Sequence, residues 1–222
     1  MTGSITSLAT PEIDVATGLR SLGLSLSDAV CAKLDAYVAL LAKWNRTYNL
    51  TAIREPARMV THHVLDALAV LPHLPQRAYA RLLDVGAGAG IPGIPLAIAR
   101  PGWQIVLVDS SGKKATFLTQ AAIELALPNV CAVASRVEDL RDQPPFDVVI
   151  ARAFSDLRTF VQSSAHHLAP EGALYAMKGV YPTEEVAALP PSIELIAAPQ
   201  LRVPGLDAVR HLIVMRPRAL PA

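Results

Sequence analysis

The chain has 222 residues, of which 52% are hydrophobic and 18% are charged, and its formal net charge is +1. This composition is typical of a globular protein, and the low net charge excludes a globally basic nucleic-acid binder while allowing a local basic patch. The sequence contains no run of about 18 uncharged apolar residues and no N-terminal secretory signal pattern, so we expect a cytoplasmic protein with no membrane contact. Its two cysteines, Cys31 and Cys131, lack metal-ligand spacing, and no metal site is predicted.

Residues 1–77 have the hydrophobic period of amphipathic helices. Residues 25–28 are typical of a capping box, and apolar side chains then recur at spacings of four and three. A second helix is predicted to begin at Pro56. On this second helix we expect His63 and Asp66 to share one face, and we favour a hydrogen bond there that fixes the helix against the sheet over acid–base chemistry or a metal. The sequence therefore predicts an N-terminal helical extension over residues 1–77.

From residue 78 onward, apolar runs of strand length alternate with helical stretches, which is typical of a parallel sheet with helices on both faces. Strands are predicted at 81–85, 104–109, 130–134, 146–151 and 172–177, and helices at 93–100, 112–126 and 156–168. Two later runs, 193–197 and 211–215, are joined by a loop too short for a crossover helix, so we expect an antiparallel hairpin. The predicted fold is α/β. It is a Rossmann-like, seven-stranded sheet of the class I methyltransferase kind, with an antiparallel C-terminal hairpin, forming one compact domain over residues 78–218.

A glycine-rich segment follows the first predicted strand and opens the next helix. Its glycines permit positive φ and lack the Cβ atoms that would keep a ligand from the backbone: Gly86, Gly88 and Gly90. Asp84 precedes them and would repel a pyrophosphate, whereas the ammonium and sulfonium of S-adenosylmethionine suit a carboxylate. Asp109 ends the next strand at about the 20-residue spacing of an acid that accepts hydrogen bonds from a ribose. A nucleoside cofactor is favoured over a tight structural turn.

Several further motifs occur in a fixed order along the chain. They are Lys43-Trp44-Asn45, His63-Val64-Leu65-Asp66, Asp84-Val85-Gly86, Asp109-Ser110, Arg136-Val137-Glu138, Arg152-Ala153-Phe154 and Lys178-Gly179. With these motifs the chain resembles the RsmG family, also called glucose-inhibited division protein B, over about residues 30–216. The resemblance implies an S-adenosylmethionine-dependent enzyme that methylates ring nitrogen 7 of a guanine in 16S ribosomal RNA. Its partner would be that RNA or the small ribosomal subunit.

The resemblance also implies site residues. Cofactor contacts would fall on Gly86, Ile91, Val137, Glu138 and Arg152, in addition to those expected from the glycine-rich segment and from Asp109. Ring nitrogen 7 of guanine has a free lone pair, so methyl transfer to it needs no general base and catalysis should consist mostly of positioning. Arg152 is also our candidate catalytic residue, because an arginine is a natural donor to oxygen 6 of guanine.

Basic residues that could contact RNA phosphates lie in three places: Arg46, Lys113 with Lys114, and Lys178. Each could instead be an ordinary solvated surface charge. No leftover apolar helix face is obvious, so we expect a monomer.

Three other functions stay open at this point. A nicotinamide oxidoreductase is disfavoured by Asp84 and by the terminal hairpin. A non-catalytic RNA-binding or ribosome-assembly protein with a cofactor fold would bind RNA without transferring a methyl group. A small-molecule methyltransferase is disfavoured by the basic residues and by the motifs in the helical region. The sequence does not identify the modified guanine, nor whether naked RNA or an assembled subunit is the substrate.

Overall fold

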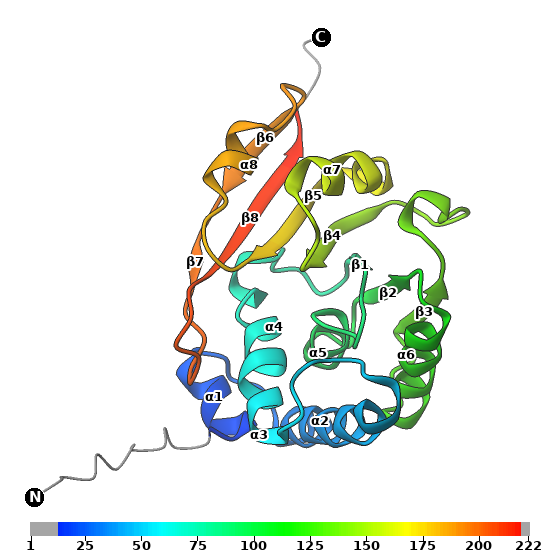
Figure 1. The fold of residues 1–222 in the computed structure, drawn as a ribbon, viewed down its shortest axis with the longest axis vertical. Helices are drawn as coiled ribbons and strands as arrows, with labels where there is room; N and C mark the ends of the chain where they lie inside the picture. The colour runs from blue at the N-terminus through cyan, green and yellow to red at the C-terminus, as the bar shows by residue number, and fades with distance from the viewer. Residues whose placement is uncertain (1–12, 219–222) are drawn as a thin grey trace, which may run out of the picture.

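A mixed sheet forms the centre of the computed structural model, which describes residues 13–218 (Figure 1). The strand order is β3-β2-β1-β4-β5-β8-β6, with β7 paired to β8 outside this path. The strands are β1 (Arg81–Val85), β2 (Gln104–Asp109), β3 (Val130–Ala134), β4 (Phe146–Arg152), β5 (Leu168–Lys178), β6 (Ile193–Ala197), β7 (Gln200–Leu201) and β8 (Arg210–Pro217).

The first five strands are mutually parallel, and β8 is antiparallel to both β5 and β6. The predicted seven-stranded path with an antiparallel C-terminal hairpin is thereby confirmed. Two details differ from the prediction. The two-residue strand β7 is too short to produce a sequence pattern, and β5 begins at Leu168, so the helix predicted over 156–168 ends at Ser164.

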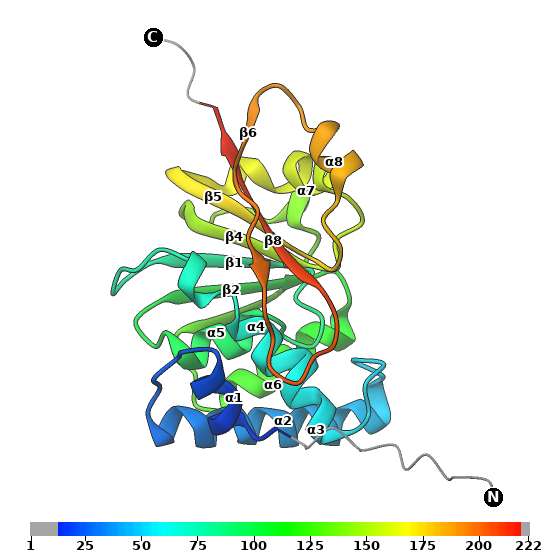
Figure 2. The same ribbon diagram turned by 90° about the vertical axis from the view of Figure 1, so that its left-hand side faces the viewer.

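Helices cover both faces of this sheet (Figures 1 and 2). The α-helices are α1 (Val15–Ser21), α2 (Asp28–Tyr48), α3 (Pro56–Met59), α4 (Asp66–Leu68), α5 (Gly93–Ala99), α6 (Gly112–Glu124), α7 (Leu157–Ser164) and α8 (Thr183–Ala187). The shorter elements are the π-helix η1 (Val60–Leu65) and the 3-10 turns η2 (Leu71–His73), η3 (Val137–Asp139) and η4 (Ala165–His167). None of the described helices is both long and apolar enough to cross a membrane.

Successive strand residues point to opposite faces, and this alternation divides the core in two. On β1, Leu82 packs with α5, α6 and the N-terminal helices, whereas Leu83 packs with α7 on the other face. The helices before residue 77 thus share one apolar core with the sheet. The domain boundary near residue 77 stays a prediction.

Helix α2 is anchored at its start and along its buried face. Ser27 is its N-cap and accepts a hydrogen bond from the Val30 N–H at 3.4 Å, as a helix-capping serine does. Tyr37 is buried, and its hydroxyl donates to the Ala89 carbonyl at 2.7 Å. Helix α2 therefore supports the glycine-rich loop directly.

Asp66 makes the expected hydrogen bond that fixes this helix against the sheet, to Arg152 of β4, whereas His63 makes none to the sheet among the described residues. The π-helix η1 ends at Leu65, and its wider turn alters the three-residue and four-residue alignment of an α-helix. The His63 ring contacts the Thr51 hydroxyl at 2.9 Å, and Asp66 pairs with arginines from the sheet.

Candidate functional site

A cavity of about 320 Å³ opens beside the carboxyl ends of β1 and β2, where open parallel sheets bind their ligands. Its lining is drawn from strand ends and the turns that follow them: Val85, Gly86, Val108, Asp109, Ser110, Lys114, Ser135, Arg136, Val137, Glu138 and Phe154. Four of the nine predicted cofactor contacts lie on this wall: Gly86, Asp109, Val137 and Glu138.

The three glycines of the loop have different roles, although all have positive φ. Gly86 has φ +69°, and no atom lies within 4 Å of where its Cβ would be, so its backbone borders open space. Gly88 donates its N–H to the Asp109 carboxylate at 2.9 Å. A Cβ on Gly90 would lie 2.5 Å from Ile94, so Gly90 permits close packing of α5 against the loop.

Asp84 lies beneath the loop and does not line the cavity. It faces the α5 side of β1, where one carboxylate oxygen accepts the Gly93 N–H at 2.8 Å. Its other oxygen has no hydrogen-bond partner within the described part of the chain. Complete burial raises the pKa of Asp84 to about 7. Strand alternation therefore makes Asp84 an anchor for α5. Asp84 and Ile91, which is 3% exposed, do not line the cavity, and their cofactor contacts stay predictions.

Asp109 faces the cavity and also holds the loop around it. One of its oxygens accepts from Gly88, the other accepts the Ser111 N–H at 2.9 Å, and Lys114 lies 3.7 Å away. A carboxylate has about four acceptor positions, so Asp109 retains capacity for a ligand hydroxyl. This geometry is compatible with the ribose contact predicted from its spacing.

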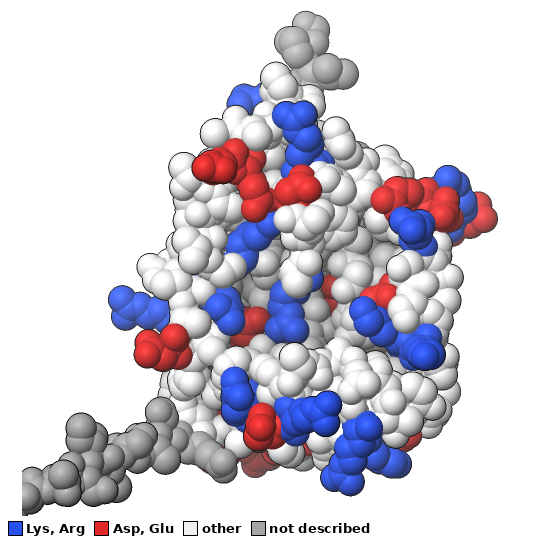
Figure 3. Space-filling model, viewed as in Figure 1, with Lys and Arg blue, Asp and Glu red and all other residues white. Residues whose placement is uncertain are grey.

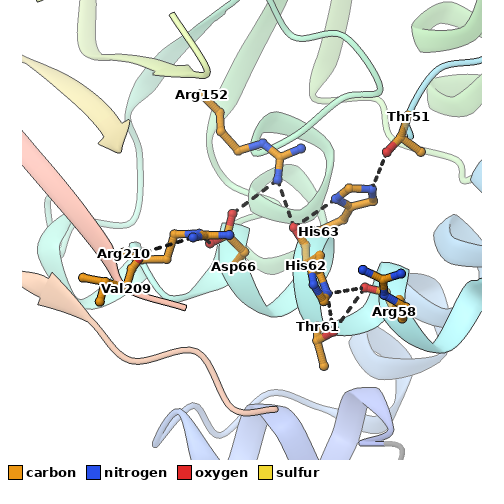
Figure 4. A network of polar contacts seen from close by, with 9 residues as sticks. All are labelled: Thr51, Arg58, Thr61, His62, His63, Asp66, Arg152, Val209 and Arg210. Carbon is orange, nitrogen blue, oxygen red and sulfur yellow. Dashed lines mark hydrogen bonds and ion pairs between the residues drawn. The ribbon is translucent and has the colours of Figure 1, made fainter. Parts of the chain in front are cut away.

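Arg152 lies outside the cavity lining, at the carboxyl end of β4, and belongs to a separate group that we call the arginine cluster: Asp66, Arg152 and Arg210 (Figure 4). The Nη1 atom of Arg152 lies 3.3 Å from one Asp66 oxygen and donates to the His62 carbonyl at 2.9 Å. The Nε atom of Arg210 donates to the other Asp66 oxygen at 3.0 Å. A buried carboxylate thus joins two arginines that come from different strands.

His63 lies next to the arginine cluster but is held in its neutral form. Its Nδ1 lies 2.9 Å from the His62 carbonyl, and its ring is 3% exposed. Burial, with a smaller contribution from the charge of Arg152, lowers the pKa of His63 to about 4. Near neutral pH this histidine adds no charge to the site.

Comparison with known proteins connects this geometry to a family. The model of the family described as "rRNA small subunit methyltransferase G" matches residues 30–213. The chain belongs to this family. Ribosomal RNA small subunit methyltransferase G of Azoarcus sp. is 53% identical over 90% of this chain and 94% of the relative. The protein of that name from Nitrosospira multiformis is 50% identical over 93% and 97%.

The fold also matches solved structures. A SAM-dependent methyltransferase from Aquifex aeolicus superposes with a TM-score of 0.58 and 16% identity, covering 80% of this chain and 97% of that one. At this identity the similarity concerns the fold alone. It agrees with the class I methyltransferase sheet predicted from the alternating strands and helices.

Lys114, a predicted RNA contact, lines the cavity, whereas Arg46 lines a separate pocket beside α2 and α3. Figure 3 shows basic side chains around a hollow in the middle of the face drawn there. Arg46, in the last turn of α2, and Lys113, in the first turn of α6, are exposed. Lys178 differs, because its side chain is only 13% exposed and its ammonium contacts both carboxylate oxygens of Glu185, at 3.1 and 2.8 Å. The structure thus balances the charge of Lys178 internally.

Sequence reasoning gave no role to several residues of the site. Phe154 and Arg136 line the cavity, and both belong to strand-end motifs quoted above, which was the available signal. Ala153 lies between Arg152 and Phe154 with φ +61°, a conformation that a residue with a side chain adopts at some energetic cost. This turn separates Phe154, on the cavity wall, from Arg152, in the arginine cluster. Arg210 gave no such signal, and its association with Asp66 depends on the folded sheet.

Proposed function

We propose that the protein transfers the methyl group of S-adenosylmethionine to ring nitrogen 7 of a guanine in 16S ribosomal RNA. The observation that carries this proposal is that two unlike features lie at the same end of the sheet. One is a glycine-bordered cavity with acids on its wall, and the other is the arginine cluster, whose arginines come from the end of β4 and the start of β8. Family membership supports the substrate class. The related proteins are named as methyltransferases of the small-subunit RNA.

The residues of the cavity fit S-adenosylmethionine. The open space at Gly86 lets a ligand approach the backbone, and Asp109 offers acceptors to ribose hydroxyls. Glu138 offers a second carboxylate and Val137 an apolar surface for the adenine side of the ligand. S-adenosylmethionine, when bound, supplies an electrophilic methyl group on a positively charged sulfur.

The protein's own part in the reaction is to hold the target base in line with that methyl group. Ring nitrogen 7 of guanine carries no proton at neutral pH, so no residue has to act as a base. Among the described residues, Arg152 makes its hydrogen bonds through Nη1, which leaves the donors on Nη2 and Nε for oxygen 6 of the guanine. In-line positioning of this kind contributes up to about 7–11 kcal/mol in favourable cases.

The surface around the cavity would bind the RNA backbone. Arg46, Lys113 and Lys114 are our proposed phosphate contacts, whereas Lys178 would have to leave Glu185 to make one. We further propose that the protein acts as a monomer in the cytoplasm, on 16S RNA or on the small subunit that contains it.

The test is to incubate the protein with tritiated S-adenosylmethionine and small subunits from a strain that lacks it. Digestion of the 16S RNA to nucleosides should give radioactivity in 7-methylguanosine. Radioactivity in another nucleoside would refute the proposed target atom. RNA binding with no transfer would favour the non-catalytic, ribosome-assembly alternative.

A further inference from the structure

Asp66 has a role in the arginine cluster that the proposed function leaves open. We infer that Asp66 is a positioning residue, which holds Arg152 toward the target guanine by sharing its carboxylate between Arg152 and Arg210. The inference rests on the proposed function of Arg152. It adds an acid from the N-terminal helical region to a site otherwise built on the sheet.

The two carboxylate oxygens of Asp66 each contact a different arginine. Oδ2 of Asp66 lies 3.3 Å from Nη1 of Arg152, and Oδ1 accepts from Nε of Arg210 at 3.0 Å. The Asp66 side chain is 3% exposed, whereas those of Arg152 and Arg210 are 27% and 26% exposed. The carboxylate is therefore the buried centre of the cluster, and the guanidinium groups retain surface for an external ligand.

A second contact fixes the orientation of Arg152 from the same helix. Its Nη1 also donates to the carbonyl of His62, which lies in the π-helix η1 directly before α4 (Figure 4). Two anchors on one helix, a charged oxygen and a backbone oxygen, restrict the guanidinium much more than one flexible ion pair would. Segments of π-helix recur at functional sites, and this one sets the spacing of both anchors.

Electrostatics gives the inference a distinctive signature. Replacing the Asp66 carboxylate with a neutral amide would leave two guanidinium groups close together with no negative charge between them, and they would repel each other. Arg152 would then leave its position at the site. The surface would nevertheless gain one unit of positive charge, so its attraction for RNA phosphates would not decrease.

The test compares Asp66→Asn with the unchanged protein in single-turnover methyl transfer and in RNA binding at fixed salt. We expect the transfer rate to fall about 10-fold to 100-fold, as misplacement of a reacting group by about 1 Å can produce. The RNA dissociation constant should stay equal or decrease, and the affinity for S-adenosylhomocysteine should stay within about twofold. Asp66→Glu, which keeps the charge, should have an intermediate rate and serves as the folded variant if Asp66→Asn does not fold.

Asp147→Asn is the matched control. Asp147 lies at the amino end of β4, where it accepts the Arg81 N–H at 2.8 Å and pairs with Arg77 at 3.2 Å. Its substitution should lower the melting temperature without changing the transfer rate of the folded protein.

Three outcomes would overturn the inference. They are a rate for Asp66→Asn within twofold of the unchanged protein, equal rates for Asp66→Glu and the unchanged protein, or a loss of RNA affinity in parallel with the rate. An unchanged protein that forms no 7-methylguanosine would refute the proposed function and this inference together. An active unchanged protein with an equally active Asp66→Asn would refute this inference alone.

Discussion

The cavity and the arginine cluster both lie at the carboxyl ends of the parallel strands but are built in different ways. The cavity is formed by strand ends and turns within residues 85–154, and its loop is fixed by hydrogen bonds such as that from the Gly88 N–H to the Asp109 carboxylate. The arginine cluster joins Asp66, Arg152 and Arg210, which come from α4, β4 and β8. Under the proposed function, cofactor binding would therefore depend mainly on backbone shape at the strand ends, whereas target recognition would depend on contacts between elements far apart in the sequence.

The largest expected effect is that of Arg152→Ala, which alters the arginine cluster and leaves the cavity lining unchanged. In Arg152→Ala we expect the rate of methyl transfer to fall by about 10²-fold, the loss that a misplacement of the target base by about 1 Å can produce. Arg216→Ala is the control, because Arg216 makes only an exposed ion pair with Glu194 at 3.8 Å near the far end of β8. Single-turnover kinetics measures both variants. A rate within threefold for Arg152→Ala would remove this arginine from the mechanism.

The second prediction concerns the backbone of the cavity. Gly86 and Gly23 have nearly the same φ, +69° and +72°, and neither has an atom within 4 Å of where its Cβ would be. Alanine at either position should cost about 1–2 kcal/mol of backbone strain, seen as a similar loss in the free energy of unfolding. Only Gly86→Ala should also raise the KM for S-adenosylmethionine, by about tenfold, because its methyl group enters the ligand space. Equal KM values in the two variants would show that the cavity is not the cofactor site.

The same two regions show how much of the structure could be predicted from the sequence. The parallel strands, the terminal hairpin and the cavity residues Gly86 and Asp109 were predictable, because glycine spacing and strand ends are local patterns. The hydrogen bond by which Asp84 anchors α5 was not predictable, since it depends on which face of β1 the side chain occupies.

The pairing of Asp66 was missed for a related reason. A π-helix gives no sequence period that distinguishes it from an α-helix, so the sequence did not show which of His63 and Asp66 would bond to the sheet. The arginine partners are also far away in sequence, and only the strand order brings Arg210 next to Arg152. Long-range contacts of this kind lie beyond a reading of local patterns.

The third prediction concerns the pH dependence of stability that Asp84, the anchor of α5, should produce. Because burial raises the pKa of Asp84 to about 7, the folded protein binds this proton more tightly than the unfolded chain does. Asp84 therefore stabilises the fold below about pH 4, and this contribution is lost as the pH rises to about 7. Asp84→Asn keeps an acceptor for the Gly93 N–H, so its stability relative to the unchanged protein should increase with pH across this range.

Denaturant unfolding at several pH values measures the effect. Each pKa unit corresponds to about 1.4 kcal/mol of pH-dependent free energy. A constant stability difference between Asp84→Asn and the unchanged protein from pH 4 to pH 7 would contradict the assignment.

The smallest expected effect concerns the RNA-binding surface around both regions. Lys113→Ala should weaken RNA binding modestly and reduce the slope of log affinity against log salt by about 1, as loss of one phosphate contact does. Lys33→Ala is the control, because Lys33 lies in α2 and its ammonium donates to the Ala126 carbonyl at 3.4 Å. The two variants are compared by titration at several salt concentrations. An unchanged slope in Lys113→Ala would exclude Lys113 from the phosphate contacts.

The most direct test of the two-part site is calorimetric titration of S-adenosylhomocysteine into Gly86→Ala and Arg152→Ala. The account predicts that Gly86→Ala binds the ligand about tenfold more weakly than the unchanged protein, since the added methyl group narrows the cavity. Arg152→Ala should bind it with unchanged affinity, because Arg152 is not on the cavity wall. Loss of binding in Arg152→Ala with normal binding in Gly86→Ala would contradict the account.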